Sequence, residues 1–267
     1  MLTVTTKPIL VCGLAFVFLL VAYWEVRLQV SPLKNTVWNY GFNLVIAASY
    51  LMAAAAAFWA QRSFRPNQAA YSILRSFGIA ALLWTVAFSI WATYNLVLHD
   101  DIPYPSLEDA FFIAAYPFLG LALWKLHFSY KTKPTNKTIG EAMIIVATSA
   151  ILIFIFLNRP DVSSDLGLTK NLLNIAYSLG DVLLLAMALL QLRSGQAIKH
   201  PGLYLLVIFL LLQVAADALF SYRNNASIYW NGDIADFYFA VSGLTFALTL
   251  MSGRLFEDAK RAIHTKL

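Results

Sequence analysis

Apolar residues along this chain are grouped into long runs that short polar stretches separate. A helix that spans the hydrocarbon core of a bilayer needs about 20 apolar residues. Eight runs reach or approach that length, and turn-forming stretches such as Arg65-Pro66-Asn67 and His200-Pro201-Gly202 divide them. The pattern therefore predicts eight transmembrane helices, over residues 8–26, 37–59, 72–98, 107–127, 139–158, 171–192, 202–222 and 234–255.

The composition leads to the same class of protein. Of the 267 residues, 60% are hydrophobic and only 12% are charged, whereas soluble domains carry roughly 25% charged residues. The single cysteine, Cys12, excludes an intramolecular disulfide and a cysteine-based metal centre. We predict an all-α, multi-pass protein of the cell membrane, with one eight-helix domain over 1–255 and a short basic cytoplasmic tail over 256–267.

The charges predict the orientation of the chain in the membrane. With both termini cytoplasmic, fourteen of the nineteen Lys and Arg residues lie on the inner side, and eleven of the fourteen acidic residues lie on the outer side. The inner side then carries +11 and the outer side −6. Because cytoplasmic loops of membrane proteins are enriched in Lys and Arg, this distribution favours cytoplasmic termini.

Polar residues within the predicted helices gather toward the outer side. Ionisable groups in hydrocarbon cost free energy and usually have a specific role. On three helices the polar residues recur at helical spacing, as in the i, i+4, i+7 series of the sixth helix. We predict a ligand-binding pocket in the outer half, formed by Asp181, Asp217, Asn174, Ser178, Gln213, Asp109 and Asp236.

The same residues also fit a purely structural role. Isolated Asp, Asn and Ser side chains often join membrane helices by hydrogen bonds, and Arg223 or Lys170 could pair with either Asp181 or Asp217. Both interpretations stay open at this point.

Motifs for catalysis are not found in the sequence. All four histidines lie in loops or at helix ends, and there is no Gly-rich phosphate loop or serine nucleophile elbow. The stretch Ser178-Leu179-Gly180-Asp181 is similar to the Gly-x-Gly-Asp motif of intramembrane aspartyl proteases, but Leu179 stands where that motif has glycine. We therefore predict no enzymatic activity, no cofactor and no metal site.

Short segments at the outer ends of three helices are similar to one another. Ser106-Leu107-Glu108-Asp109 and Ser178-Leu179-Gly180-Asp181 open the fourth and sixth helices, and an acid-led segment opens the eighth. This pattern predicts that three consecutive helical hairpins repeat in parallel orientation.

Part of the chain resembles a known class of sensor. The stretch 104–112, Tyr-Pro-Ser-Leu-Glu-Asp-Ala-Phe-Phe, the following Tyr116-Pro117-Phe118-Leu119 and the later Ala216-Asp217-Ala218-Leu219-Phe220 carry the resemblance. They are similar to motifs of the multi-helix membrane input regions that precede diguanylate cyclase or histidine kinase domains in bacteria and archaea. The resemblance covers about residues 70–255 and implies a sensor in a prokaryotic inner membrane. The chain departs from that class because no cyclase, kinase or PAS domain follows the eighth helix.

The leading functional hypothesis is a non-enzymatic membrane module that binds a ligand in the outer pocket and signals to a separate cytoplasmic partner. Its partners would be the lipid bilayer, that signalling protein and a second copy of the chain in a homo-oligomer, with no nucleic acid. The alternatives are an accessory subunit of a larger membrane complex and a transporter.

Overall fold

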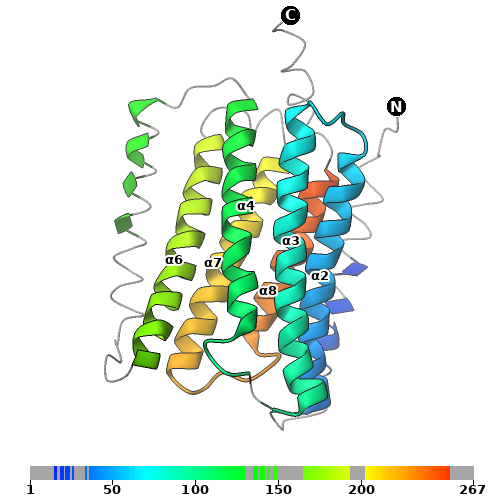
Figure 1. Cartoon of the computed structure of the whole chain (residues 1–267), viewed down its shortest axis with the longest axis vertical. Helices are drawn as coiled ribbons and strands as arrows, with labels where there is room; N and C mark the ends of the chain where they lie inside the picture. The colour runs from blue at the N-terminus through cyan, green and yellow to red at the C-terminus, as the bar shows by residue number, and fades with distance from the viewer. Residues whose placement is uncertain are drawn as a thin grey trace, which may run out of the picture.

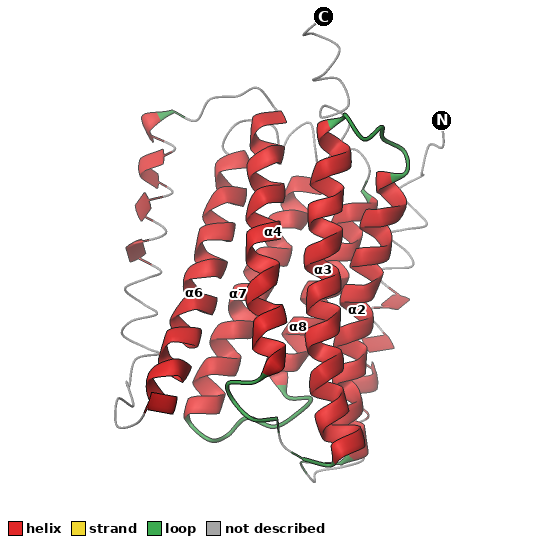
Figure 2. Ribbon diagram, viewed as in Figure 1, coloured by secondary structure: helices red, strands yellow, loops and turns green. Residues whose placement is uncertain are grey.

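The computed structural model describes residues 36–100, 102–129, 165–192 and 202–252 continuously, and single positions within 15–34 and 135–148. All regular structure in these residues is helical, as Figures 1 and 2 show. Six helices are long and apolar enough to cross a membrane. They are α2 (Val37–Gln61), α3 (Ala69–Thr93) with a π-helical extension (Tyr94–Leu98), α4 (Leu107–Ser129), α6 (Asp165–Gln191), α7 (Gly202–Asn225) and α8 (Ile234–Met251).

These six helices correspond to six of the eight predicted segments. The predicted segments 8–26 and 139–158 lie largely outside the described residues, and so does the tail 256–267. The described positions within 15–26 and 136–148 are helical. The all-α prediction is therefore confirmed for the described part of the chain, which has the apolar helices of a polytopic membrane protein.

The six helices close into a ring. α2 contacts α3 and α8, α4 contacts α3 and α6, and α7 contacts α6 and α8. Each helix therefore has two neighbours, in the order α2–α3–α4–α6–α7–α8 around the ring (Figure 1). Such a ring encloses a central space that side chains from all six helices can reach.

Aromatic side chains fill the middle of the ring. Tyr50, Phe77, Trp84, Phe209 and Phe246 are among the largest fully buried side chains. The rings of Phe209 and Phe246 stack at 4.2 Å, and the ring of Trp84 meets that of Tyr50 edge-on at 5.0 Å. Aromatic pairs in these arrangements add roughly 0.5–1.5 kcal/mol each beyond the area they bury. Beyond these rings, a cavity lies at one end of the central space.

We call that end of the ring the pocket end; it carries the loops 99–106 and 226–233 and lies at the bottom of Figure 1. Local signals define both loops. Residue His99 caps the π-helical extension in the left-handed conformation, with a φ of 56°. Residue Asp233 begins α8 as its N-cap and accepts a hydrogen bond from the Ala235 N–H at 2.7 Å. A side-chain oxygen at this position satisfies one of the free N–H groups of a helix N-terminus.

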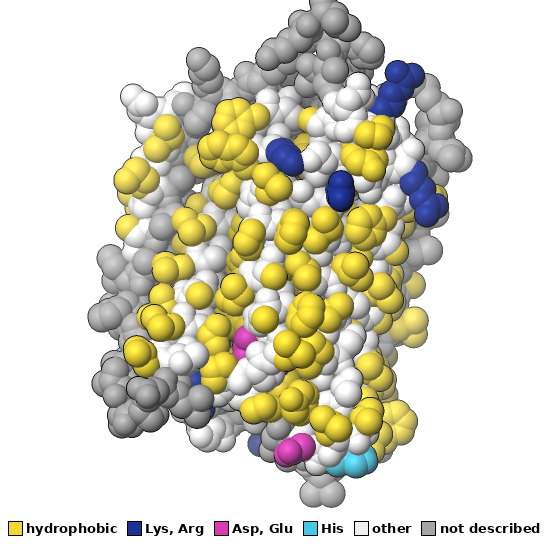
Figure 3. All heavy atoms as spheres, viewed as in Figure 1, with side chains coloured by type: hydrophobic (Ala, Val, Ile, Leu, Met, Phe, Trp, Pro, Cys, Tyr) yellow, Lys and Arg dark blue, Asp and Glu magenta, His cyan; other side chains and the backbone are white. Residues whose placement is uncertain are grey.

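The charged side chains of the visible face lie mostly toward its two ends. Figure 3 shows Lys and Arg side chains near the end opposite the pocket end, and acidic, histidine and some further Lys or Arg side chains toward the pocket end. Between them the visible face of the bundle is largely hydrophobic. The acidic side chains that are visible on this face thus lie toward the pocket end.

Candidate functional site

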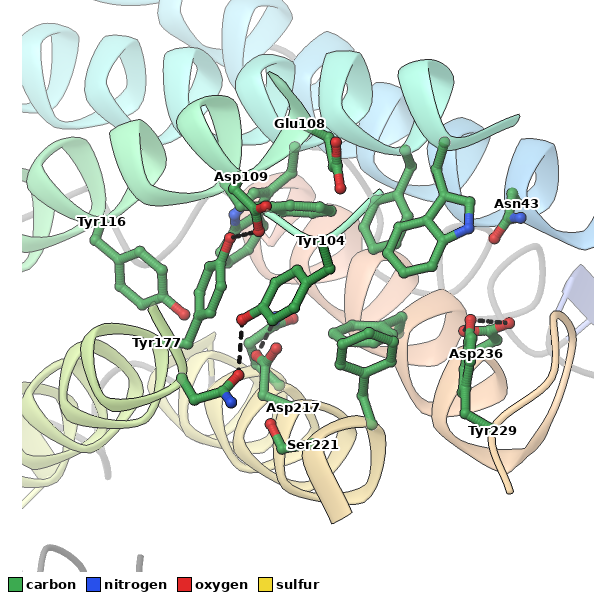
Figure 4. Close-up of a pocket in the computed structure, with 18 residues that line it drawn as sticks. Asn43, Tyr104, Glu108, Asp109, Tyr116, Tyr177, Asp217, Ser221, Tyr229 and Asp236 are labelled. Atoms are coloured by element: carbon green, nitrogen blue, oxygen red, sulfur yellow. Dashed lines mark hydrogen bonds between the residues drawn. The ribbon is translucent and has the colours of Figure 1, made fainter. Parts of the chain in front are cut away.

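An inner cavity of about 40 Å³ lies inside the ring at the pocket end. Eighteen residues line it, of which ten are aromatic and four are acidic, and the described lining contains no Lys, Arg or His. The volume is sufficient for a few water molecules, since one water needs about 10–15 Å³ measured in this way. Figure 4 shows the labelled side chains of this lining around Tyr104.

An outer cavity of about 280 Å³ lies between the inner cavity and the two loops of the pocket end. The two cavities have five lining residues in common, and these residues form the neck between them. The neck residues are Trp91, Tyr104, Glu108, Phe220 and Tyr229.

The first turn of α4 brings two acidic residues to the cavity. The carboxylate of Asp109 accepts hydrogen bonds from the Tyr177 hydroxyl at 2.6 Å and from the Ser106 N–H at 2.7 Å. Carboxylates are favoured in this position because the N-terminus of a helix carries partial positive charge. Glu108 is only 2% exposed, and its Oε2 has no hydrogen-bond partner among the described residues.

The carboxyl groups of Asp181 on α6 and Asp217 on α7 lie within hydrogen-bonding range of each other. A hydrogen bond between two carboxyl groups requires a proton on one of them, because an ionised carboxylate only accepts. Asp181 also accepts from the Tyr116 hydroxyl at 2.8 Å, and Asp217 accepts from the Gln213 amide at 2.9 Å. The two helices are therefore joined by a buried acidic pair with its own donors.

Gly180 explains how α4 approaches α6 so closely beside this pair. A Cβ atom at Gly180 would lie 2.5 Å from the ring of Tyr116. No side chain fits in that space, so the glycine allows the Tyr116 ring to lie against α6 and its hydroxyl to reach Asp181.

Gln213 extends the network across the ring. Its Oε1 accepts hydrogen bonds from the Tyr50 hydroxyl of α2 at 2.6 Å and from the Ser242 hydroxyl of α8 at 3.1 Å. Its amide donates to Asp217. These hydrogen bonds connect α2 and α8 to α7, and the bond from Tyr116 to Asp181 connects α4 to α6 beside them.

Asn231 joins three elements at the mouth of the pocket. Its Oδ1 accepts from the Asn43 amide and from the Trp91 indole, each at 2.9 Å, and its backbone carbonyl accepts from the Asn39 amide at 2.9 Å. These donors come from α2 and α3, and Asn231 lies in the loop before α8. The loop 226–233 is therefore held against the ring by buried hydrogen bonds.

Two further acidic residues hold the start of α8. Asp236 accepts from the Tyr229 hydroxyl at 2.9 Å and from the Gly232 N–H, and Asp233 pairs with Arg223 of α7. Burial raises the pKa of Asp233, whereas the Ala235 N–H and Arg223 lower it in part. Burial also raises the pKa of the Tyr229 and Tyr104 hydroxyls, so both tyrosines stay neutral hydrogen-bond donors.

The structure brings together most of the residues that the sequence predicts for the pocket. Five of the seven line the inner cavity: Asp109, Asn174, Gln213, Asp217 and Asp236. Of the other two, Asp181 does not line the cavity, but it is next to two residues that do, Asp217 and Tyr116. Ser178 is buried on α6 but is not among the lining residues. The ligand-binding role of these residues stays a prediction.

Other site residues are not predicted by the sequence analysis, which assigns the aromatic residues mainly to helix packing and the membrane interface. The hydroxyls of Tyr50, Tyr104, Tyr116, Tyr177 and Tyr229 all bond to polar groups of the network. A buried tyrosine needs a partner for its hydroxyl, which is the signal that could have found them. Glu108 is also missed, because in the sequence it stands out only as part of a motif.

Comparison with protein-family models, with curated proteins and with solved structures finds no match to this chain. The site itself is therefore the basis for any functional conclusion.

The inner cavity combines aromatic faces with polar groups. The described lining offers carboxyl groups, tyrosine hydroxyls, amides and aromatic faces. Within the described residues there is no group of three or more His, Cys, Asp or Glu side chains that could hold a metal ion. A concave, mostly aromatic cavity with a few convergent polar groups is typical of a small-molecule site.

Proposed function

We propose that the chain is an eight-helix membrane module of the cell membrane that binds a small ligand at its pocket end and signals to a separate cytoplasmic partner. The observation that carries the proposal is the buried network around the inner cavity, in which acidic and amide side chains of α4, α6, α7 and α8 converge. The pocket end faces outward in this proposal, and both termini are cytoplasmic.

A signal could pass along the helices that carry the site. Gln213 and the two carboxyl groups of Asp181 and Asp217 connect α7 to α2, α6 and α8 near the pocket end. A ligand that changes these contacts changes how α6 and α7 pack against each other, and each helix runs the full length of the bundle. Buried polar networks are suited to this because they have discrete alternative arrangements.

The packing of the bundle favours a binding module over a transporter. A transported substrate needs a route through both halves of the membrane, commonly past broken helices at the midplane. The half opposite the pocket is filled here by the rings of Phe77, Phe209 and Phe246, which pack on one another at 4.2–5.5 Å. This filling supports a site that is open from one side.

The proposed orientation predicts which loops react with a reagent that cannot cross the membrane. Asn67 and Asn225 are both exposed and lie at opposite ends of the bundle. In a Cys12→Ser background, Asn225→Cys should react with an impermeant maleimide in right-side-out vesicles, whereas Asn67→Cys should react only after permeabilisation. Inverted vesicles should reverse the result, and labelling of Asn67→Cys in intact right-side-out vesicles would contradict the orientation.

The ligand-binding role predicts a specific effect of Asp217→Asn. Asparagine keeps the shape of the side chain and an oxygen that can accept from Gln213, so insertion and the melting temperature of the free protein should change little. A ligand at about 100 times its Kd stabilises the folded state by about 2.7 kcal/mol, which raises the melting temperature by roughly 5–10 °C for a chain of this size. We expect a ligand-induced rise of this kind in wild type, and its loss in Asp217→Asn and Asp181→Asn.

The measurement is thermal unfolding of purified protein in lipid nanodiscs against cationic, neutral and anionic small compounds. Asp100→Asn is the matched control, because Asp100 is exposed in the loop that follows α3 and does not line either cavity. If no compound of any charge stabilises wild type and both substitutions only lower the yield of folded protein, the carboxyl groups are structural contacts between helices.

A further inference from the structure

The neck between the two cavities contains a buried acceptor that the described residues leave without a donor. Glu108 is 2% exposed and lines both cavities, and its Oε2 has no hydrogen-bond partner among the described residues. Buried polar atoms in folded proteins nearly always have a partner, because burial without one costs free energy. A ligand in the neck would be in position to supply the missing donor.

The other acidic residues of the lining already have donors. Both oxygens of Asp109 accept, from Tyr177 and from the Ser106 N–H, and Asp236 accepts from Tyr229 and the Gly232 N–H. Asp217 accepts from the Gln213 amide at 2.9 Å. Glu108 is thus the lining carboxylate that lacks a donor for one of its oxygens within the described structure.

Aromatic side chains surround the same position. The ring of Phe220 lies 5.6 Å from that of Trp91 and 4.8 Å from that of Tyr229, in edge-to-face arrangements. Tyr104 completes the neck. The faces of aromatic rings attract cations through their quadrupole, and this attraction is strongest where water is excluded.

The composition of the lining favours a cation over an anion. Acidic residues line both cavities, and the described lining of neither contains Lys, Arg or His. Two described cations lie near the lining without being part of it: Arg223 pairs with Asp233, and the ammonium group of Lys34 lies 6.0 Å from the ring of Trp230, which lines the outer cavity. An anionic ligand would meet repulsion here, whereas a cation would be attracted by Glu108 and by the aromatic faces.

We propose that the neck binds the protonated amino group of a small organic amine, with its N–H groups donating to Glu108 Oε2 and its charge against the rings of Trp91, Phe220 and Tyr229. This assignment rests on the proposed function and specifies the ligand class of the same site. The amine would enter through the outer cavity, which has room for the rest of a small molecule. An N–H donor is required because a quaternary ammonium group would supply charge but leave the carboxylate oxygen without a hydrogen bond.

The binding test uses n-butylammonium chloride as the probe and the full chain in phosphatidylglycerol nanodiscs. Tryptophan fluorescence and the melting temperature report binding, since Trp84 and Trp91 line the inner cavity. We expect n-butylammonium to bind, tetramethylammonium to bind at least about 3-fold more weakly, and neutral 1-pentanol and anionic pentanoate not to bind in the same range. Butylammonium competing with phosphatidylethanolamine in mixed nanodiscs would identify a lipid headgroup as the source of the amine, and no competition would identify a free amine.

Two pairs of variants connect binding to the neck. Glu108→Gln keeps the size of the side chain and should weaken butylammonium binding at least 10-fold, whereas the control Asp100→Asn should leave it unchanged. Phe220→Leu should weaken binding about 3-fold or more, since a cation–aromatic contact is worth about 0.5–2 kcal/mol and 1.4 kcal/mol is tenfold in affinity. The control is Phe128→Leu, at an exposed phenylalanine near the opposite end of α4.

The outcomes separate this assignment from the proposed function. If 1-pentanol or pentanoate stabilises wild type and Glu108→Gln binds the same compound equally well, the amine assignment is wrong while a binding module remains. If no compound of any charge binds, both are wrong. Should Glu108→Gln fail to fold, the pair Phe220→Leu and Phe128→Leu decides, and equal affinity in these two variants overturns the assignment.

Discussion

Replacement of Gly243 by leucine is expected to prevent α8 from packing on α2 and to be the most destabilising single substitution considered for this protein. A Cβ atom at Gly243 would lie 2.1 Å from the Oγ of Ser49 and 3.2 Å from the Ser49 backbone carbon. Because a backbone atom is involved, rotation of one side chain cannot relieve the contact. Insertion of extra atoms into a packed core costs about 1–3 kcal/mol, and more where the backbone must move.

The measurement is the melting temperature and the monodisperse fraction of detergent-solubilised protein. We expect Gly243→Leu to lower the melting temperature by roughly 10 °C or more, from about 2–4 °C per kcal/mol for a chain of this size. Gly140→Leu is the matched control, because a Cβ atom at Gly140 meets no atom of the described residues within 4 Å. The smaller Gly243→Ala should be partly rescued by Ser49→Gly, which removes the two closest atoms. Equal melting temperatures for Gly243→Leu and Gly140→Leu would contradict this account.

Hydrophobic runs and turn residues were sufficient to predict four of the six helix starts. The predicted starts of the segments 37–59, 107–127, 202–222 and 234–255 coincide with the first residues of α2, α4, α7 and α8. A proline or a helix-capping residue stands just before the helix in several of these cases. The prediction for α6 was less accurate: the helix begins at Asp165 rather than at residue 171. Hydropathy cannot detect a polar first turn such as this one, because a helix can extend beyond the hydrocarbon core of the bilayer into polar surroundings.

Helical spacing predicted which polar residues share a face, but it could not predict contacts between helices. Gln213 and Asp217, four residues apart, do form a hydrogen bond. The pairing of Asp181 with Asp217 and the position of Tyr50 beneath Gln213 depend on the order of the helices around the ring. That order follows from side-chain packing between segments far apart in the sequence, which periodicity along one helix does not contain. Arg223 illustrates the same limit, since it pairs with Asp233 rather than with Asp181 or Asp217.

Removal of the Arg223 side-chain charge is expected to destabilise the pocket end in a pH-dependent manner. Asp233 is 1% exposed at its side chain and pairs with Arg223, which is 24% exposed. Loss of one partner from a buried ion pair costs about 3–5 kcal/mol, because the remaining charge has no counter-charge. Because Arg223 is partly exposed, we expect about 2–3 kcal/mol for Arg223→Met, or roughly 5–10 °C in melting temperature at pH 8. Arg62→Met, at an exposed arginine of the opposite end, should change it little.

The pH dependence of this effect follows from the state of Asp233. Burial raises the pKa of Asp233, and Arg223 is one of the groups that oppose this rise. Without Arg223 the pKa should rise further, so that ionisation of Asp233 disfavours the folded state above the ordinary pKa of aspartic acid, about 3.9. The deficit of Arg223→Met should therefore grow with pH and be smaller at pH 4.5 than at pH 8.

A second substitution separates the charge of Asp233 from its role at the helix start. In Asp233→Asn the side-chain oxygen can still accept from the Ala235 N–H and cap α8, while no charge is buried. The double variant Arg223→Met, Asp233→Asn should therefore recover most of the stability that Arg223→Met loses at pH 8, and its stability should vary less with pH. If the double variant were as unstable as Arg223→Met at pH 8, the loss would come from packing of the arginine stem instead of the uncompensated charge. Recovery would show that the uncompensated charge of Asp233 causes the loss of stability at the pocket end.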